Sequence, residues 1–187
     1  MTRPTLALVG LSGVGKSTVL RAVSEHIQFQ HLQASTLIKA SREALAAAPI
    51  ATDDLRRANI NDNQALLIEG FRIARSPDAS SVILDGHTVV DTPSGLVKIA
   101  PEVFGALGIS GFVFVAEDAE VIFQRRRADQ TRNRPDRSPE ELDEQQTQAL
   151  LAAFQAARAL RVPLHVLSTS HIAQIRHVIA GLLRTQG

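Results

Sequence analysis

The stretch Gly10-Leu11-Ser12-Gly13-Val14-Gly15-Lys16-Ser17 directly follows the apolar run Leu6-Ala7-Leu8-Val9. It matches G-x-x-x-x-G-K-[ST], the P-loop pattern, in which glycines let successive backbone N–H groups turn inward around a phosphate oxygen. The apolar run predicts a strand, and the residues after Ser17 carry apolar side chains at helical spacing. Because the motif requires strand, loop and helix in this order, the stretch predicts a nucleoside triphosphate site, whereas the alternative is an accidental glycine-rich turn.

The loop gives each of its side chains an expected role. Lys16 supplies a cation at the β- and γ-phosphates, and Ser17 supplies a hydroxyl to the Mg²⁺ that accompanies ATP. The helix that begins here directs its positive end at the same charge. The residues expected to bind ATP are Ser12, Gly13, Val14, Gly15, Lys16, Ser17 and Thr18.

Composition bounds the remaining possibilities. The 187 residues include 20 Lys and Arg against 19 Asp and Glu, so the overall field gives no reason to expect a nucleic-acid or membrane partner. The absence of cysteine excludes disulfides and thiolate zinc sites. Only residues 1–4 precede the first expected strand, and no apolar run reaches membrane-spanning length, so we expect a cytoplasmic protein. No pattern indicates an oligomeric state.

Strand and helix patterns alternate along the chain, which predicts an α/β fold with a parallel sheet between two layers of helices. Strands are expected at 5–9, 27–32, 81–85, 111–116 and 163–168. Helices are expected at 16–26, 36–47, 53–74, 101–107, 118–129, 139–160 and 171–184. We therefore predict a single P-loop NTPase domain over residues 1–187, built as a three-layer α/β/α sandwich on a five-stranded parallel sheet.

The strand expected at 81–85 delivers Asp85-Gly86-His87 at its carboxyl end, where ligands bind in open α/β sheets. Asp85 is expected to organise Mg²⁺ opposite Ser17, although an Asp-Gly turn at a strand end would look the same. His87 has two interpretations that the sequence does not separate. It is either a contact to a phosphate or acceptor group, or a polar residue at the rim of the sheet.

Arginines concentrate between two expected helices. Arg125-Arg126-Arg127 ends one helix, and further arginines follow at Arg132, Arg134 and Arg137. Planar guanidinium groups bind phosphate oxygens in bidentate fashion, so we expect a small Arg-rich lid at 130–138. The alternative is a solvated helix face, since several acidic residues lie nearby in the sequence.

The segment 35–75 separates the second and third expected strands and is the expected acceptor-binding insertion. It offers Thr36, Lys39 and Arg42, of which Lys39 and Arg42 lie near the expected end of a strand. Asp85 and His87 are expected to complete the acceptor site. The alternative is that long helices simply expose such side chains to solvent.

From Val82 onward the chain resembles the archaeal-type adenylate kinases and their relatives among nucleoside monophosphate kinases. The matching features are Asp85-Gly86-His87, 92–95, 112–118, Arg125-Arg126-Arg127, Arg132, Arg134 and 144–146. The resemblance implies γ-phosphoryl transfer from Mg·ATP to a nucleoside monophosphate. Two departures stand out: Ser12 occupies a loop position where adenylate kinases commonly carry proline, and His87-Thr88 replaces the Pro-Arg of ordinary bacterial members.

Three hypotheses for function follow. The first is an ATP-dependent nucleoside monophosphate kinase whose catalytic residues are Lys16, Arg125, Arg126, Arg132 and Arg134. The second keeps the same ATP site but phosphorylates a different small metabolite. The third is a nucleotide-gated binding module that hydrolyses ATP slowly and acts through a partner.

Overall fold

The computed structural model describes residues 3–47, 60–92, 95–129 and 135–184. Its centre is a five-stranded sheet in the order β2-β3-β1-β6-β7, and every neighbouring pair is parallel. The strands are β1 (Thr5–Val9), β2 (Gln30–Gln33), β3 (Val82–Gly86), β6 (Gly111–Ala116) and β7 (Leu164–Ser168). The predicted three-layer α/β fold with five parallel strands is therefore confirmed.

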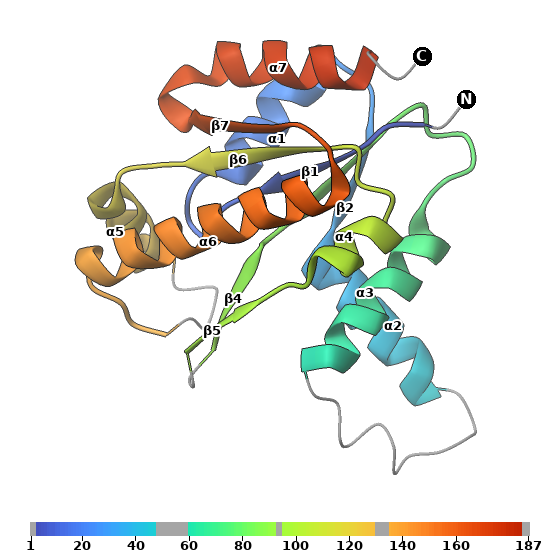
Figure 1. Cartoon of the computed structure of the whole chain (residues 1–187), viewed down its shortest axis with the longest axis horizontal. Coiled ribbons are helices and arrows are strands. Elements are labelled where there is room, and N and C mark those ends of the chain that lie inside the picture. Colours follow the sequence, from blue (N-terminus) through green and yellow to red (C-terminus); the bar gives the residue numbers. More distant parts are fainter. Residues whose placement is uncertain (1–2, 48–59, 93–94, 130–134, 185–187) are drawn as a thin grey trace.

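Helices cover both faces of the sheet (Figure 1). They are α1 (Lys16–Ser24), α2 (Ala34–Ala47), α3 (Ile60–Ala74), α4 (Pro101–Ala106), α5 (Ala119–Ala128), α6 (Pro139–Leu160) and α7 (Ile172–Arg184), with a short 3₁₀ helix η2 (Thr169–His171). Helices α1 and α7 pack together on one face, while α6 and α4 lie on the other. No helix in the described part of the chain is long and apolar enough to cross a membrane.

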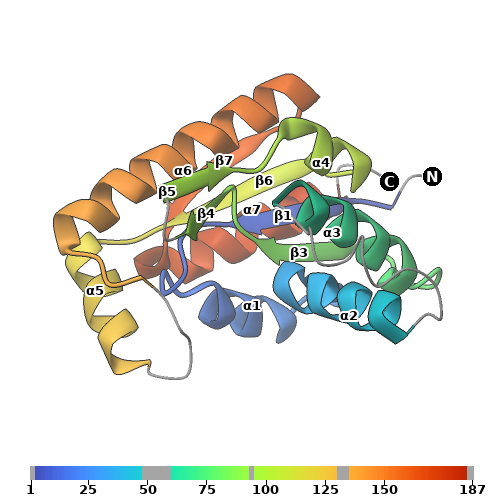
Figure 2. The same cartoon turned by 90° about the horizontal axis from the view of Figure 1, so that it is seen from below.

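A second, two-stranded sheet extends from the domain. Strands β4 (Val89–Thr92) and β5 (Gly95–Lys98) pair in antiparallel fashion, with Val90 opposite Val97. Both strands contact α6, and Figure 2 shows the pair beside this helix. The sequence analysis predicts neither of these strands, because each has only four residues.

The second strand of the main sheet begins later than predicted. The sequence predicts a strand at 27–32, whereas β2 pairs with β3 only from Gln30, which lies opposite Val82. The Ile27 N–H instead donates to the Val23 carbonyl, so the chain continues the last turn of α1 at this point. The first part of the predicted helix 53–74, residues 53–59, lies outside the described residues.

The central strands make the hydrophobic core and fix where the site lies. All five residues of β1 are buried, as are Phe112 and Phe114 of β6. Phe104 of α4 contacts Phe112 edge to face, with ring centroids 5.2 Å apart. Because parallel strands end at the same edge of a sheet, β1 and β3 place the P-loop beside Asp85-Gly86-His87.

Candidate active site

The P-loop joins the end of β1 to the start of α1 through glycines in unusual conformations. Gly10, Gly13 and Gly15 have φ angles of 151°, 88° and 105°, a region that favours glycine. A Cβ on Gly10 would lie 2.5 Å from the Val115 carbonyl oxygen. The backbone path of the loop therefore depends on glycine both for its dihedral angles and for its close approach to β6.

Lys16 is the buried cation of the loop, with 8% of its surface exposed. Its Nζ donates to the carbonyls of Gly10 at 3.1 Å and Leu11 at 3.2 Å. Asp85 Oδ1 lies 3.9 Å from the same nitrogen, and the Asp85 side chain is 12% exposed. Burial strengthens the attraction between these opposite charges, so the pair fixes the ammonium between the loop and the end of β3.

A cavity of about 650 Å³ opens over this pair, and we call it the large cavity. It is lined by Ser12, Gly13, Gly15, Lys16, Ser17, Gln33, Ala34, Ser35, Asp85, Gly86, His87, Arg125 and Asp129. The structure therefore brings most of the predicted ATP-binding residues together with Asp85, His87 and Arg125. Val14 and Thr18 do not line it: the Val14 side chain is buried in the core, and Thr18 is exposed elsewhere.

His87 lies against the P-loop. Its Nδ1 is 2.7 Å from the Gly10 carbonyl oxygen, and since a carbonyl can only accept, Nδ1 carries the hydrogen. His87 lines the large cavity and also a smaller one. The sequence left two interpretations open for His87. The structure places it at the rim of the sheet, where it contacts the P-loop and also lines the large cavity.

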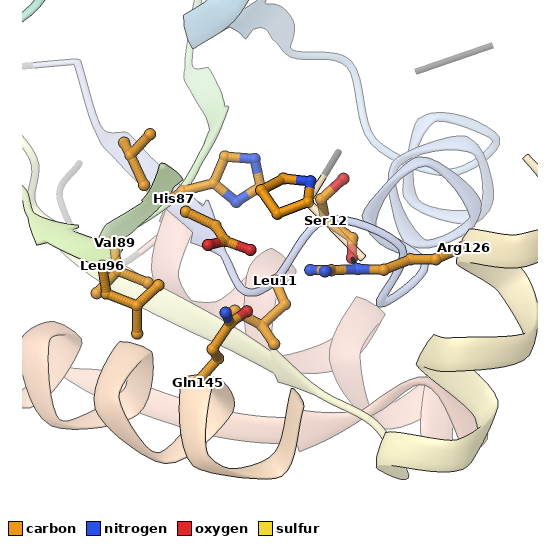
Figure 3. A pocket seen from close by; sticks show the side chains of 10 residues that line it. Leu11, Ser12, His87, Val89, Leu96, Arg126 and Gln145 are labelled. Atoms are coloured by element: carbon orange, nitrogen blue, oxygen red, sulfur yellow. Dashed lines mark hydrogen bonds between the residues drawn. The ribbon is translucent and has the colours of Figure 1, made fainter. Parts of the chain in front are cut away.

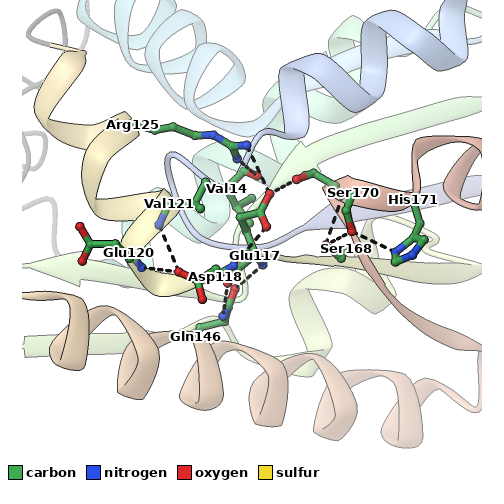
Figure 4. A network of polar contacts seen from close by, with 11 residues as sticks. Val14, Glu117, Asp118, Glu120, Val121, Arg125, Gln146, Ser168, Ser170 and His171 are labelled. Carbon is green, nitrogen blue, oxygen red and sulfur yellow. Dashed lines mark hydrogen bonds and ion pairs between the residues drawn. The ribbon is translucent and has the colours of Figure 1, made fainter.

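Arg125 and Arg126 of α5 both donate to backbone carbonyls of the P-loop, and Figure 4 shows Arg125 beside Val14. Arg125 Nη1 donates to the Val14 carbonyl at 2.9 Å, and Arg126 Nε donates to the Ser12 carbonyl at 2.9 Å. Arg127 instead lies over the Phe123 ring, 5.6 Å from its centroid. Two of the three consecutive arginines thus contact the loop, while the predicted catalytic residues Arg132 and Arg134 lie outside the described residues.

A polar network that the sequence analysis did not assign to the site holds Arg125 in place. Glu117 Oε2 accepts from Arg125 Nη2 at 3.3 Å and also from the Thr169 hydroxyl (Figure 4). The Gln146 side chain binds both backbone groups of Glu117, at 3.0 and 2.9 Å. Glu117 follows β6 directly, so its place at a strand end was the signal that could have identified it.

The predicted acceptor residues of α2 point to other partners. The Thr36 hydroxyl donates to Gln33, Lys39 pairs with Glu43 at 3.8 Å, and Arg42 donates to Asn63 Oδ1 at 2.5 Å. Lys39 is 78% exposed, and none of the three lines the large cavity. The α2 end of the cavity is made instead by Ala34 and Ser35, with Gln33 of β2.

The oxygen donors of the large cavity fit Mg²⁺. The Ser17 hydroxyl and the Asp85 carboxylate line it together, and hydroxyl and carboxylate oxygens are ligands that Mg²⁺ prefers. Within the described ranges, no three His, Asp or Glu side chains group closely enough to hold a metal alone. The site therefore suits a Mg²⁺ ion that shares its coordination with substrate phosphates.

Comparison with known proteins agrees with this geometry. Residues 9–143 match the protein family described as "AAA domain". An adenylate kinase of Thermoplasma acidophilum is 32% identical to the chain over 154 residues, which cover 79% of the chain and 80% of that kinase. The chain therefore belongs to the P-loop kinase family that includes this adenylate kinase.

Solved structures of other P-loop kinases share the fold. A gluconokinase from Sinorhizobium meliloti aligns with a TM-score of 0.52 at 21% identity, covering 98% of this chain and 93% of that one. A shikimate kinase from Bacteroides thetaiotaomicron aligns with a TM-score of 0.55 at 17% identity, covering 96% and 98%. The chain is thus a P-loop phosphotransferase by family, and these solved structures share its fold. The names of the proteins that it resembles give different acceptors.

Proposed function

We propose that the protein transfers the γ-phosphoryl group of Mg·ATP to a nucleoside monophosphate. The similarity to an adenylate kinase over about four fifths of both chains carries this proposal. That similarity extends well beyond the P-loop, whereas the likeness to sugar and shikimate kinases is one of fold. In the proposed reaction the bond between the γ-phosphorus and the β,γ-bridging oxygen breaks. A bond to a phosphate oxygen of the acceptor forms, giving ADP and a nucleoside diphosphate.

The large cavity supports this chemistry through charge and positioning. Phosphoryl transfer passes through a loose transition state, so a kinase contributes mainly alignment and charge neutralisation. Lys16 offers a buried ammonium at the cavity floor, already oriented by two carbonyls and by Asp85. Arg125 lines the same cavity and is held by Glu117, so its guanidinium is positioned at the wall without rearrangement.

Ser17 and Asp85 are the residues that would hold the Mg²⁺ of Mg·ATP. When bound, the ion would neutralise negative charge that develops on the β- and γ-phosphates during transfer. The N–H groups of the loop and the amino end of α1 bind the phosphates beside it. His87 keeps the loop in this shape through its bond to Gly10.

A coupled assay of ATP consumption tests the proposal. AMP, GMP, CMP, UMP and dTMP are added one at a time with Mg²⁺, against a sample without acceptor. We expect at least one monophosphate to stimulate ATP consumption and to appear as its diphosphate in equal amount. A flat response from protein that binds ATP would contradict the proposal, and gluconate and shikimate would then be the next acceptors to try.

A further inference from the structure

A second cavity shares Ser12 and His87 with the large cavity, and Figure 3 shows the side chains that line it. We call it the small cavity; its volume is about 180 Å³. It is lined by Leu11, Ser12, His87, Val89, Val90, Asp91, Leu96, Arg126, Pro135 and Gln145. Most of these residues come from the P-loop, the β4–β5 hairpin, α5 and α6, so the hairpin forms one wall of the small cavity.

The walls of the small cavity are suited to a flat apolar ring. Leu11 and Val89 are buried side chains, and Leu96 of the hairpin packs against the core. Figure 3 shows Leu96 and Val89 on one side and Leu11 on another. A cavity of about 150 Å³ with aliphatic walls is known to accept benzene, so this space is large enough for a planar six-membered ring, such as the one that every nucleobase contains.

Gln145 places an unsatisfied acceptor in these walls. The residue is only 7% exposed, and its Oε1 has no hydrogen-bond partner among the described residues. Figure 3 shows its side chain rising from α6 with the amide end toward the cavity. Buried polar atoms in folded proteins are nearly always bonded, so this oxygen calls for an N–H or O–H donor.

The small cavity is connected to the phosphate site by shared residues. Ser12 and His87 line both cavities, and Arg126 of the small cavity donates to the Ser12 carbonyl. A ligand with a phosphate beside Ser12 and His87 therefore has room for its ring in the small cavity. This is the shape of a nucleoside monophosphate whose phosphate faces the ATP site.

We propose that the small cavity binds the base of the acceptor and that Gln145 Oε1 accepts an N–H of that base. This inference rests on the proposed function and makes Gln145 a specificity-determining residue. A site built to bond a substrate N–H discriminates strongly against an analogue that lacks it, because its own polar group is then left unpaired. The preferred acceptor is thus a base with an amino or imino N–H on the edge that enters the cavity.

The test compares natural monophosphates with a ring that has no N–H donor. The most active acceptor found in the coupled assay is measured beside purine riboside 5′-monophosphate, whose base carries no N–H. We expect kcat/KM for this analogue to be at least about 100-fold lower in the unaltered protein. In Gln145→Leu we expect the KM of the natural acceptor to rise more than tenfold, and the difference between the two acceptors to shrink below tenfold.

Two further variants keep the test independent of folding. Gln145→Glu retains the size of the side chain and an acceptor oxygen, so we expect it to keep discriminating between the two acceptors. Gln155→Leu makes the same exchange at an exposed position of α6 and should leave all parameters unchanged. The KM for ATP should stay near its original value in every variant, because Gln145 does not line the large cavity. The melting temperature of each variant is measured beside the kinetics, so that a loss of stability is seen separately from a change in KM.

The outcomes separate this inference from the proposed function. If no monophosphate is phosphorylated, the proposed function fails, and the base-binding role fails with it. If a monophosphate is phosphorylated but Gln145→Leu keeps its KM and its discrimination, only the role of Gln145 and the small cavity is overturned. A rise in the KM for ATP equal to that for the acceptor would also overturn it, since that result indicates a general structural effect.

Discussion

The two cavities that meet at His87 are built in different ways. The large cavity takes its floor from one loop, through Ser12, Gly13, Gly15, Lys16 and Ser17, and most of its polarity from backbone and charged groups. The small cavity is assembled from residues between Leu11 and Gln145 that are distant in sequence, and aliphatic side chains make much of its wall. The first arrangement suits phosphates, which all nucleotides share, and the second suits a feature that differs between acceptors.

Removing the cation of the large cavity should have the largest effect. In Lys16→Ala we expect phosphoryl transfer to fall by about 10²–10³ or more, because a buried charge directed at the transferring group is lost. Activity is measured in the coupled assay and folding by circular dichroism. Lys98→Ala, at an exposed residue of β5 outside both cavities, is the control. Full activity in a folded Lys16→Ala protein would show that ATP binds elsewhere.

Adding one methyl group to the P-loop should be nearly as harmful. In Gly10→Ala the new Cβ would meet the Val115 carbonyl, and the φ angle of 151° would become strained. We expect a loss of about 1–3 kcal/mol in the free energy of unfolding and at least roughly tenfold weaker ATP binding. Urea denaturation and equilibrium dialysis measure the two effects.

Gly181→Ala is the matched control for that substitution. Gly181 lies within α7, and a Cβ there would meet no atom within 4 Å. Alanine favours helix over glycine by about 1 kcal/mol, so this variant should be unchanged or slightly more stable. Equal losses of stability and of ATP binding in both variants would contradict the prediction, because the effect would then not depend on the geometry of the P-loop.

Substitutions at two neighbouring arginines should affect the two cavities differently. Arg125 lines the large cavity and Arg126 the small one. We expect Arg125→Ala to raise the KM for ATP and Arg126→Ala to raise the KM for the acceptor, each by about tenfold, since charge-assisted bonds are lost. Steady-state kinetics with each substrate varied in turn measure both constants.

Arg127→Ala provides the control for this pair, because Arg127 packs on Phe123 and lines neither cavity. Its constants should stay within about twofold of the original protein. If Arg125→Ala and Arg126→Ala changed the same constant, the division of labour between the cavities would be wrong.

The smallest change in kinetics is expected for substitutions in the ion pairs that link the hairpin to α6. Arg137 donates to Asp91 of β4 at 2.9 Å and lies near Glu141 of α6 at 3.3 Å. The hydrogen bond to Asp91 raises the pKa of Arg137, so the guanidinium stays charged at every working pH. We expect Asp91→Asn and Arg137→Gln each to raise the acceptor KM about two- to threefold through a looser wall of the small cavity.

A double-mutant cycle tests this contact. The rise in acceptor KM for the double variant, expressed as a free energy, should be smaller than the sum of the rises for the two single variants. The reason is that both substitutions remove the same interaction. Glu69→Gln, which breaks the exposed Glu69–Arg72 pair of α3, should leave the acceptor KM unchanged. Strictly additive effects would show that the Asp91–Arg137 contact does not hold the hairpin.

Prediction from sequence was accurate where the signal is local. The P-loop and the five parallel strands each depend on a few adjacent residues, and both are confirmed. Strand β2 was predicted three residues too early, because Ile27 and Phe29 are apolar but the backbone at Ile27 bonds to α1. The apolar pattern reports only which side chains are buried, whereas backbone pairing with β3 decides where the strand begins.

The sequence by itself determined the chemistry of the ATP site. A glycine-rich loop, a lysine and a serine at fixed spacing place their groups through local backbone geometry, which adjacent residues control. Tertiary structure alone decided which distant residues join that loop. It brought Glu117 and Thr169 to Arg125, His87 to Gly10, and Gln145 to the hairpin, while Lys39 and Arg42 were directed to partners outside the large cavity. Contacts of this kind depend on how helices pack on the sheet, and no spacing along the chain records that packing.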